Sequence, residues 1–169
     1  MNRQRLCVLI TISLLCVMRL AAQDTTAVRP KAHVPVHFDP ARDAAKDISD
    51  AVALAQKSHK RIILDVGGEW CIWCRRLDTL FETHDDLAAY LHEHFIPVKV
   101  NYSKENENTK VLSRYPAIPG YPHLFVLDEN GKLLKSQDTG ELESGKHHDP
   151  AKVMAFLRKW APGEPTENK

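Results

Sequence analysis

Apolar residues recur at two different spacings along the chain, and each spacing predicts a different kind of element. Between residues 41 and 55 they follow one another at intervals of four and three, which indicates a helix of about 18 residues with one apolar face. Asp39-Pro40 lies just before this stretch, and aspartate followed by proline is typical of a helix start. Short, continuous apolar runs, which are typical of buried strands, alternate with such helical stretches over the rest of the chain.

The order of these elements predicts a layered α/β fold. Asp128-Glu129-Asn130-Gly131 predicts a hairpin turn, because Asn-Gly supplies the positive φ angles that such turns need. Strands that alternate with helices favour a parallel sheet covered on both faces, and the late hairpin adds antiparallel strands. The expected strands are residues 61–66, 96–102, 124–127 and 132–137, and the further helices are residues 71–81, a helix from 85 or 86, residues 105–114 and a last helix after Asp149-Pro150.

The first 22 residues predict a secretory signal peptide. Arg3 and Arg5 supply a positive start, residues 6–18 form a short apolar run, and small residues lead to a cleavage point after Ala22. An uncleaved membrane anchor is the alternative, but the run has only about 13 residues, whereas about 20 are needed to span a bilayer. We therefore expect the protein to be exported, without stable membrane insertion after cleavage.

The length of the chain suffices for one domain with a hydrophobic core. We expect this domain at residues 39–160, preceded by a linker or loosely attached arm at 23–38 and followed by a flexible tail at 161–169. The hydrophobic content of 43% and the charged content of 27% are ordinary for a soluble globular protein. We expect a monomer without a cofactor.

Loss of residues 1–22 changes both the net charge and the cysteine count. Three arginines and no acidic residue leave, so the formal net charge falls from +1 to −2. This balance indicates neither nucleic acid nor an anionic membrane surface as a partner. Cys7 and Cys16 leave as well, so Cys71 and Cys74 are the only cysteines expected in the exported protein.

Cys71-Ile72-Trp73-Cys74 lies at the predicted start of a helix, directly after a buried strand. The first turn of a helix presents free N–H groups and a partial positive charge, and both stabilise a thiolate. We therefore expect the pKa of Cys71 to be lowered and Cys71 to be the attacking thiol. Cys74 lies one turn deeper, where it can displace the mixed disulfide that Cys71 forms with a partner.

Three other interpretations of this cysteine pair compete with redox chemistry. A structural disulfide across so short a loop contributes only about 2 kcal/mol, which is a weak reason for its presence. A zinc site needs four ligands, so His84, His92 and His94 would have to complete it, although they fall on or near a helix that apolar residues already explain. Two unrelated buried thiols are the third interpretation. His147-His148 indicates metal binding only weakly, and we expect it in a polar loop.

Residues 64–74 resemble the active-site segment of the thioredoxin superfamily. Asp65 stands six positions before the first cysteine and Trp70 stands directly before it, as in that family's pattern. Pro122 precedes a later strand, where the family has a cis-proline that faces the cysteines. The chain is similar in particular to exported thioredoxin-like proteins related to the reducing domains of bacterial thiol–disulfide interchange systems. Over about residues 40–160, the resemblance implies a three-layer sandwich with a central mixed β-sheet and helices on both faces.

The resemblance also implies roles for two charged residues. Asp65 is expected to be buried and to act as the general base that takes the proton of Cys74 through water. Lys99, on the neighbouring strand, stands where the family has a lysine that approaches this acid and tunes its pKa. An exposed carboxylate at a strand end and a lysine that points to solvent are the alternatives for these two residues.

Trp70, Trp73 and Tyr121 are expected to form an apolar groove for an extended segment of a partner, with Trp73 exposed between the cysteines. The central pair Ile72-Trp73 differs from the Gly-Pro of typical thioredoxins, and His123 stands where thioredoxins usually have threonine. Bulky residues at these positions alter access to the thiols, so the redox potential and the choice of substrate do not carry over from the family.

Together these residues favour a protein thiol–disulfide oxidoreductase, and the thioredoxin-like surroundings favour reduction over oxidation. Its substrates would be the thiols and disulfides of other proteins, with a separate protein as electron donor. Two alternatives stay open: a module that holds Cu(I) between Cys71 and Cys74 for delivery, and a thioredoxin fold that binds partners without catalysis. The chain ends in Thr166-Glu167-Asn168-Lys169, which is not an endoplasmic-reticulum retention signal, so the bacterial periplasm is the expected location and secretion the alternative.

Overall fold

The computed structural model describes residues 37–163 of the chain. The expected signal peptide with Cys7 and Cys16, nearly all of the expected arm, and residues 164–169 of the expected tail lie outside the described residues. The described elements are α1 (Ala44–Ser58), β1 (Arg61–Gly67), α2 (Ile72–Thr83), α3 (Asp85–His94), β2 (Phe95–Asn101), α4 (Thr109–Leu112), β3 (His123–Leu127), β4 (Leu133–Asp138), the 3₁₀-helix η1 (Thr139–Leu142), β5 (Glu143–Ser144), β6 (His147–His148) and α5 (Pro150–Lys159).

Four strands form a mixed sheet in the order β2-β1-β3-β4. β1 and β2 run parallel, in a register that places Asp65 opposite Lys99. β3 runs antiparallel to both β1 and β4, and Val66 near the end of β1 lies opposite His123 at the start of β3. The mixed sheet that the order of elements predicts is therefore confirmed.

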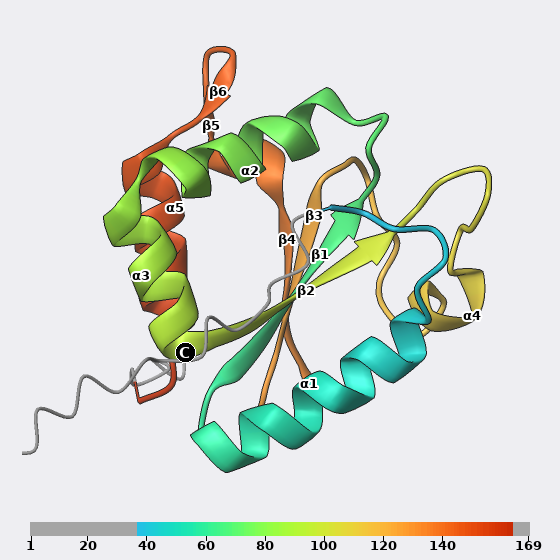
Figure 1. Cartoon of the computed structure of the whole chain (residues 1–169). Helices are drawn as coiled ribbons and strands as arrows, with labels where there is room; N and C mark the ends of the chain where they lie inside the picture. Colours follow the sequence, from blue (N-terminus) through green and yellow to red (C-terminus); the bar gives the residue numbers. More distant parts are fainter. Residues whose placement is uncertain (1–36, 164–169) are drawn as a thin grey trace, which may run out of the picture. The chain divides into compact units, whose positions relative to one another are not determined.

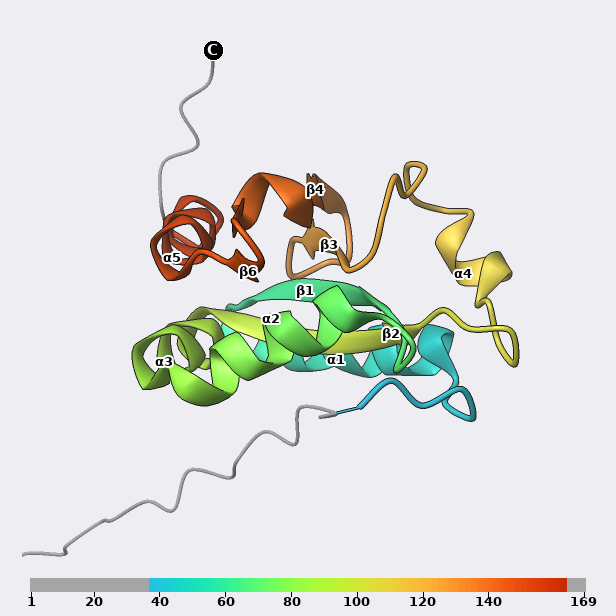
Figure 2. The ribbon, with the colours of Figure 1, turned by 90° about the horizontal axis from the view of Figure 1, so that it is seen from above.

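Each face of the sheet has its own hydrophobic core, because successive strand residues point to opposite faces. Leu64 and Val66 of β1 pack with α1 and α4, whereas Ile63 packs with α2, α3 and α5. Figure 1 shows α1 and α4 on one side of the sheet and α2, α3 and α5 on the other. Seen from above, α3 and α5 lie at one end of the sheet and α4 at the other (Figure 2). This is the expected three-layer α/β sandwich.

The first helix begins later than the sequence predicts. Asp43 is its N-cap, and the Asp43 carboxylate accepts hydrogen bonds from the backbone N–H groups of Ala45 and Lys46. Asp39 closes a preceding turn instead, by accepting from the N–H of Ala41 at 2.8 Å. Both aspartates are good capping residues, and the one beside the buried Ala44 takes the helix start, so that α1 has 15 residues.

Two other segments also differ from the expectation. The polar helix expected at residues 105–114 is reduced to α4, because asparagine side chains bond the backbone of the preceding loop; Asn108, for example, donates to the carbonyl of Asn101 at 2.7 Å. His147-His148 forms strand β6 instead of a polar loop, and His148 is buried. The last helix begins at Pro150 with Asp149 as its cap, as expected.

Candidate active site

Cys71 and Cys74 stand where β1 leads into α2. β1 ends at Gly67, and a tight turn follows in which the N–H of Cys71 donates to the carbonyl of Gly68 at 2.9 Å. Cys71 is the N-cap of α2, and its sulfur accepts the N–H of Cys74 at 3.1 Å. The two cysteines form a disulfide, with Cα atoms 5.2 Å apart. The helix N-terminus thus lies at Cys71, which favours a thiolate there once the disulfide is reduced.

The two sulfur-bearing residues differ slightly in exposure. Cys71 is 4% exposed, whereas Cys74 is completely buried. A partner sulfur therefore reaches Cys71 first, and Cys74 is positioned to act from inside the protein.

Asp65 of β1 and Lys99 of β2 form a buried ion pair inside the domain. Both residues are buried, and the Lys99 ammonium donates to Asp65 Oδ2 at 2.7 Å. Burial by itself lowers the pKa of Lys99, but the carboxylates of Asp65 and Asp78 outweigh it and raise the pKa above its ordinary value. Asp65 Oδ1 has no hydrogen-bond partner among the described residues. The structure thus brings together the two charged residues that the sequence singled out.

Asp78 is a third member of this group, which the sequence reasoning missed. It lies one helical turn after Cys74 on α2, and its Oδ1 accepts a hydrogen bond from the same Lys99 ammonium. Burial raises the pKa of Asp78 to about 6; the charge of Lys99 opposes this rise and that of Asp65 adds to it. The sequence signal for Asp78 is its spacing from Cys74. Residues four apart lie on the same face of a helix, and Asp78 follows Cys74 by four residues.

Phe38 closes the site from the N-terminal side of the domain. It is buried and packs directly on Cys71 and Cys74. The Lys99 ammonium lies 4.3 Å from the centre of the Phe38 ring, a cation–π distance. The Phe38 N–H also donates to Glu69 Oε1 at 2.8 Å. The last residue of the expected arm is therefore part of the site, and no motif in the sequence pointed to it.

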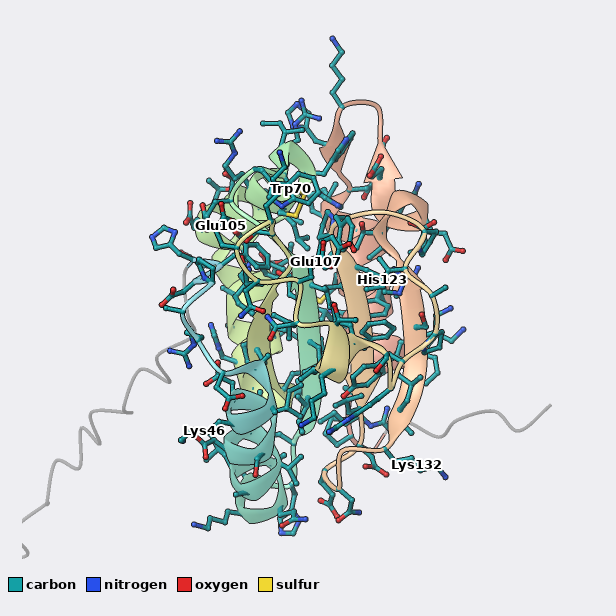
Figure 3. The ribbon with its side chains drawn as sticks, turned by 90° about the vertical axis from the view of Figure 1, so that its right-hand side faces the viewer. Lys46, Trp70, Glu105, Glu107, His123 and Lys132 are labelled. Atoms are coloured by element: carbon teal, nitrogen blue, oxygen red, sulfur yellow. A yellow bond between two sulfur atoms is a disulfide. The ribbon has the colours of Figure 1, made fainter. Side chains whose placement is uncertain are left out.

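Trp70 and Tyr121 form an aromatic wall beside the disulfide. Trp70 is 58% exposed, and its indole N–H donates to the carbonyl of Tyr102 at 2.8 Å. The ring of Tyr121 meets Trp70 edge-on at 5.7 Å and stacks on Tyr102 at 4.9 Å between centroids. Figure 3 shows Trp70 near the yellow disulfide, at the same end of the sheet as Glu105 and away from Lys46 and Lys132.

Pro122 follows this wall, and its peptide bond with Tyr121 is cis, as the resemblance implies. Its carbonyl accepts a hydrogen bond from the Thr139 hydroxyl at 2.6 Å, which ties the loop to η1. The pairing of Val66 with His123 brings the end of β1 beside the start of β3. The segment with Pro122 and the turn that leads to the cysteines therefore lie at the same end of two adjacent strands.

Trp73 differs from the expectation that it is exposed. It is partly buried and packs on the cysteine cluster, with the Arg76 guanidinium 4.5 Å from its ring centre and the ring of His148 edge-on at 5.5 Å. Ile72, which is 48% exposed, is the residue between the cysteines that reaches solvent. Ile72 is exposed in place of Trp73 because the two residues lie on different sides of the helix: Trp73 faces the β5–β6 hairpin, and Ile72 does not.

A groove of about 630 Å³ opens beside the aromatic wall. It is lined by Phe38 and Trp70 and by the loop after β2, which includes Tyr102. A second, mostly apolar pocket of about 200 Å³ lies between the sheet and α2, α3 and α5, and Asp65, Asp78 and Lys99 are among its lining residues. The first groove shares Phe38 with the cysteine cluster and is large enough to hold side chains of a partner.

Two features are absent from residues 37–163. No helix in this part of the chain is both long enough and apolar enough to cross a membrane. Nor does this part hold a group of three or more His, Cys, Asp or Glu side chains arranged to bind a metal ion.

Known proteins and structures resemble this chain. The sequence model of the thioredoxin-like family matches residues 43–129. The disulfide bond reductase DsbH of Chlamydia pneumoniae is 22% identical over 138 residues, which cover 76% of this chain and 78% of that protein. The thiol:disulfide interchange protein DsbD of Actinobacillus pleuropneumoniae is 26% identical over 94 residues, which cover 55% of this chain and 16% of that protein.

A solved structure is also similar to this chain. The disulphide isomerase from Xylella fastidiosa Temecula1 aligns with a TM-score of 0.64 and 26% identity, over 75% of this chain and 95% of that one. The family match spans α1 to the turn after β3 and so includes both cysteines, Asp65, Lys99 and Pro122.

Proposed function

Because this chain belongs to the thioredoxin-like family, we propose that it is a protein thiol–disulfide oxidoreductase whose Cys71–Cys74 pair reduces disulfides of other proteins. One observation carries the proposal: the disulfide lies at the N-terminus of α2 and packs on Phe38, and the Phe38 ring also contacts the Lys99 ammonium that pairs with the buried Asp65. The helix start favours the attacking thiolate, and the second thiol can resolve the mixed disulfide.

The reaction begins with the reduced protein. The Cys71 thiolate attacks one sulfur of a substrate disulfide, forms a mixed disulfide and releases the other substrate sulfur as a thiolate, which takes up a proton. Cys74 then attacks the Cys71 sulfur, so that the Cys71–Cys74 bond forms and the second substrate thiolate leaves. A donor protein with a dithiol returns two electrons and two protons to the pair.

Asp65 takes the proton that Cys74 gives up in the second step. Its Oδ2 is held by Lys99, while Oδ1 accepts no hydrogen bond from the described residues and is available for a proton. Lys99 positions the carboxylate and stays charged, since its pKa is raised. This arrangement supports the proposed role of Asp65 as the general base and of Lys99 as the residue that tunes it.

The aromatic wall of Trp70 and Tyr121 binds an extended segment of the partner, with Ile72 reaching into the interface between the two proteins. Trp73 packs against the two cysteines and is not the first side chain that the partner contacts. The reducing direction is supported by the name of the Chlamydia pneumoniae relative, a disulfide bond reductase.

Insulin reduction in the presence of dithiothreitol tests the proposal. The wild-type protein should accelerate precipitation of the reduced insulin chains, and Cys71→Ser and Cys74→Ser should each abolish this turnover. If the wild type is inactive but its two thiols bind Cu(I) tightly, the metal-delivery alternative replaces the reductase. If it is inactive and binds no Cu(I), a partner-binding fold without catalysis is left.

We also propose that residues 1–22 direct export to the periplasm and are removed there, which leaves a monomer that begins at Gln23. Expression of the full chain in a bacterium, followed by N-terminal sequencing of the periplasmic fraction, tests this. A protein that keeps residues 1–22 and stays with the membrane fraction would contradict it.

A further inference from the structure

The groove beside Trp70 carries an excess of negative charge that the reaction described above does not use. Its charged lining residues within residues 37–163 are three glutamates and one lysine: Glu69, Glu105, Glu107 and Lys104. The Glu69 carboxylate accepts the Phe38 N–H at 2.8 Å and lies 3.8 Å from the His37 imidazole. Glu107 is exposed, and its carboxylate has neither a hydrogen bond nor an ion pair within the described part of the chain. The groove therefore presents more carboxylates than cations to a partner.

The loop after β2 holds these carboxylates in fixed places. Ser103 Oγ donates to Glu105 Oε2 at 2.5 Å, and this hydrogen bond lowers the pKa of Glu105, which keeps the carboxylate charged. The side-chain amide of the buried Asn101 donates to the Asn106 carbonyl at 2.8 Å, and the Asn106 amide donates to the Pro40 carbonyl at 2.9 Å. A loop that is ordered before binding loses less conformational entropy when a partner docks on it.

The groove lies at the end of the sheet that holds the disulfide. Phe38 lines the groove and also packs on both cysteines. Figure 3 shows Glu105 and Glu107 at the same end of the sheet as Trp70 and the yellow disulfide. A second hollow, of about 470 Å³, shares Glu107 with the groove and reaches Tyr121 of the aromatic wall. A partner segment that docks on the aromatic wall therefore lies next to these carboxylates.

We propose that the groove selects substrate proteins with lysine or arginine a few residues from the reactive disulfide, and that Glu105 and Glu107 determine this specificity. The inference rests on the proposed function, because it concerns the substrates of the same cysteine pair. Lysine and arginine in an extended segment are attracted by the glutamates, whereas aspartate and glutamate are repelled by them. Each such contact is exposed and contributes little by itself, so the selection arises from the sum of several contacts.

Reduction of three matched peptides tests the proposal. The peptides have the same length and one disulfide each, and they carry lysine, glutamine or glutamate on either side of the cysteines. Each reaction with reduced full-length protein oxidises Cys71 and Cys74 and yields two peptide thiols, and chromatography of acid-quenched samples gives the second-order rate constant. At low ionic strength we expect the lysine peptide to react at least about tenfold faster than the glutamate peptide, with the glutamine peptide between them. At about 1 M salt, where the Debye length is about 3 Å, the three rate constants should approach one another.

Charge variants show whether the preference comes from the groove. The double variant Glu105→Gln, Glu107→Gln should reduce the ratio of the lysine to the glutamate rate constant to about 3 or less. Lys104→Gln should raise this ratio, because the groove then loses the lysine among its lining residues. Glu93→Gln removes an exposed glutamate of α3, which does not line the groove, and should leave the ratio at its wild-type value.

Equal rate constants for the three peptides, or an equal loss on all three in the double variant, would overturn the charge selection and leave the proposed function intact. A protein that reduces neither insulin nor any of the peptides would overturn the proposed function itself.

Two other occupants of the groove give different results. Arg29 and Lys31 precede Phe38 in the chain and lie outside the described residues. If they fill the groove, Arg29→Gln with Lys31→Gln speeds reduction of the lysine peptide, and does so only while Glu105 and Glu107 are present; the proposal predicts no change. If a second copy of the chain fills it, the ratio of the lysine to the glutamate rate constant falls as the protein concentration rises. Either result overturns the proposal.

Discussion

At the scale of single residues, the two carboxylates that share Lys99 are not equivalent. Asp65 comes from the middle of a buried strand, whereas Asp78 comes from a helix and its side chain is 23% exposed. Burial raises the pKa of Asp78 to about 6, from an ordinary value of 3.8. Between these two values the folded protein keeps a proton that the unfolded chain releases, so this group makes the wild type less stable as the pH rises through that window.

Asp78→Asn should remove this dependence, because asparagine does not titrate. We predict that the unfolding free energy of the variant, relative to the wild type, increases from about pH 4 to about pH 7 by up to about 3 kcal/mol. Urea unfolding at several pH values measures the difference. Glu82→Gln, at an exposed position on the same helix, should give a difference that does not change with pH. A flat curve for Asp78→Asn would show that Asp78 is not desolvated.

Trp70 offers a test of the docking surface. Its large exposed ring sits beside the disulfide and, within residues 37–163, bonds the Tyr102 carbonyl and meets the Tyr121 ring, so Trp70→Ala should leave the fold intact. We predict a loss of about tenfold in kcat/KM for insulin and a clearly smaller loss for DTNB, which is too small to use the groove. Leu54→Ala removes an exposed apolar side chain of α1 and should affect neither substrate. An equal loss of kcat/KM for insulin and DTNB would show that Trp70 affects the reactivity of the thiols and not the docking of the substrate.

At the scale of elements, the junction of β1 and α2 depends on a residue without a side chain. A Cβ at Gly67 would lie 2.5 Å from the sulfur of Cys74 and 3.1 Å from the ring of Phe38. The end of the strand can therefore pass under the disulfide only as glycine.

Gly67→Ala should push Cys74 and Phe38 apart, and we predict a loss of about 1–3 kcal/mol in unfolding free energy for the oxidised protein, as for other overpacked sites. Gly120→Ala is the matched control, because no non-adjacent residue of the described chain has an atom within 4 Å of the added Cβ. Thermal or urea unfolding of the two variants side by side gives the answer. If Gly67→Ala were as stable as Gly120→Ala, the close contact under the disulfide would not be a constraint.

The sequence predicts some elements well and others poorly, for physical reasons. β1 and α5 carry strong local signals, a continuous apolar run in one and Asp149-Pro150 in the other, and both appear where expected. α4 is shorter than expected because asparagine side chains form hydrogen bonds to the loop backbone, and the spacing of apolar residues does not predict such bonds. The β5–β6 hairpin has strands of two residues each, too short for any alternation to be visible, so its buried histidine was missed.

At the scale of the whole domain, the sheet order explains why the site residues meet. β1 lies between β2 and β3, so Asp65 faces Lys99 on one neighbour while the end of β1 adjoins Pro122 before the other. The cysteines, Asp65, Lys99 and Pro122 could be named from the family pattern. That pattern does not include Phe38 or Asp78. Phe38 reaches the cysteines only through tertiary packing, and the one sequence signal for Asp78 is its spacing of four residues from Cys74.

The central claim is that Cys71 attacks and Cys74 resolves. The mass of covalent adducts formed by reduced Cys74→Ser with oxidised insulin tests it most directly. We predict a stable mixed disulfide whose peptide map places the insulin chain on Cys71, and no such adduct with Cys71→Ser, since Cys74 is completely buried. An adduct on Cys74 in Cys71→Ser, with none in Cys74→Ser, would contradict the account.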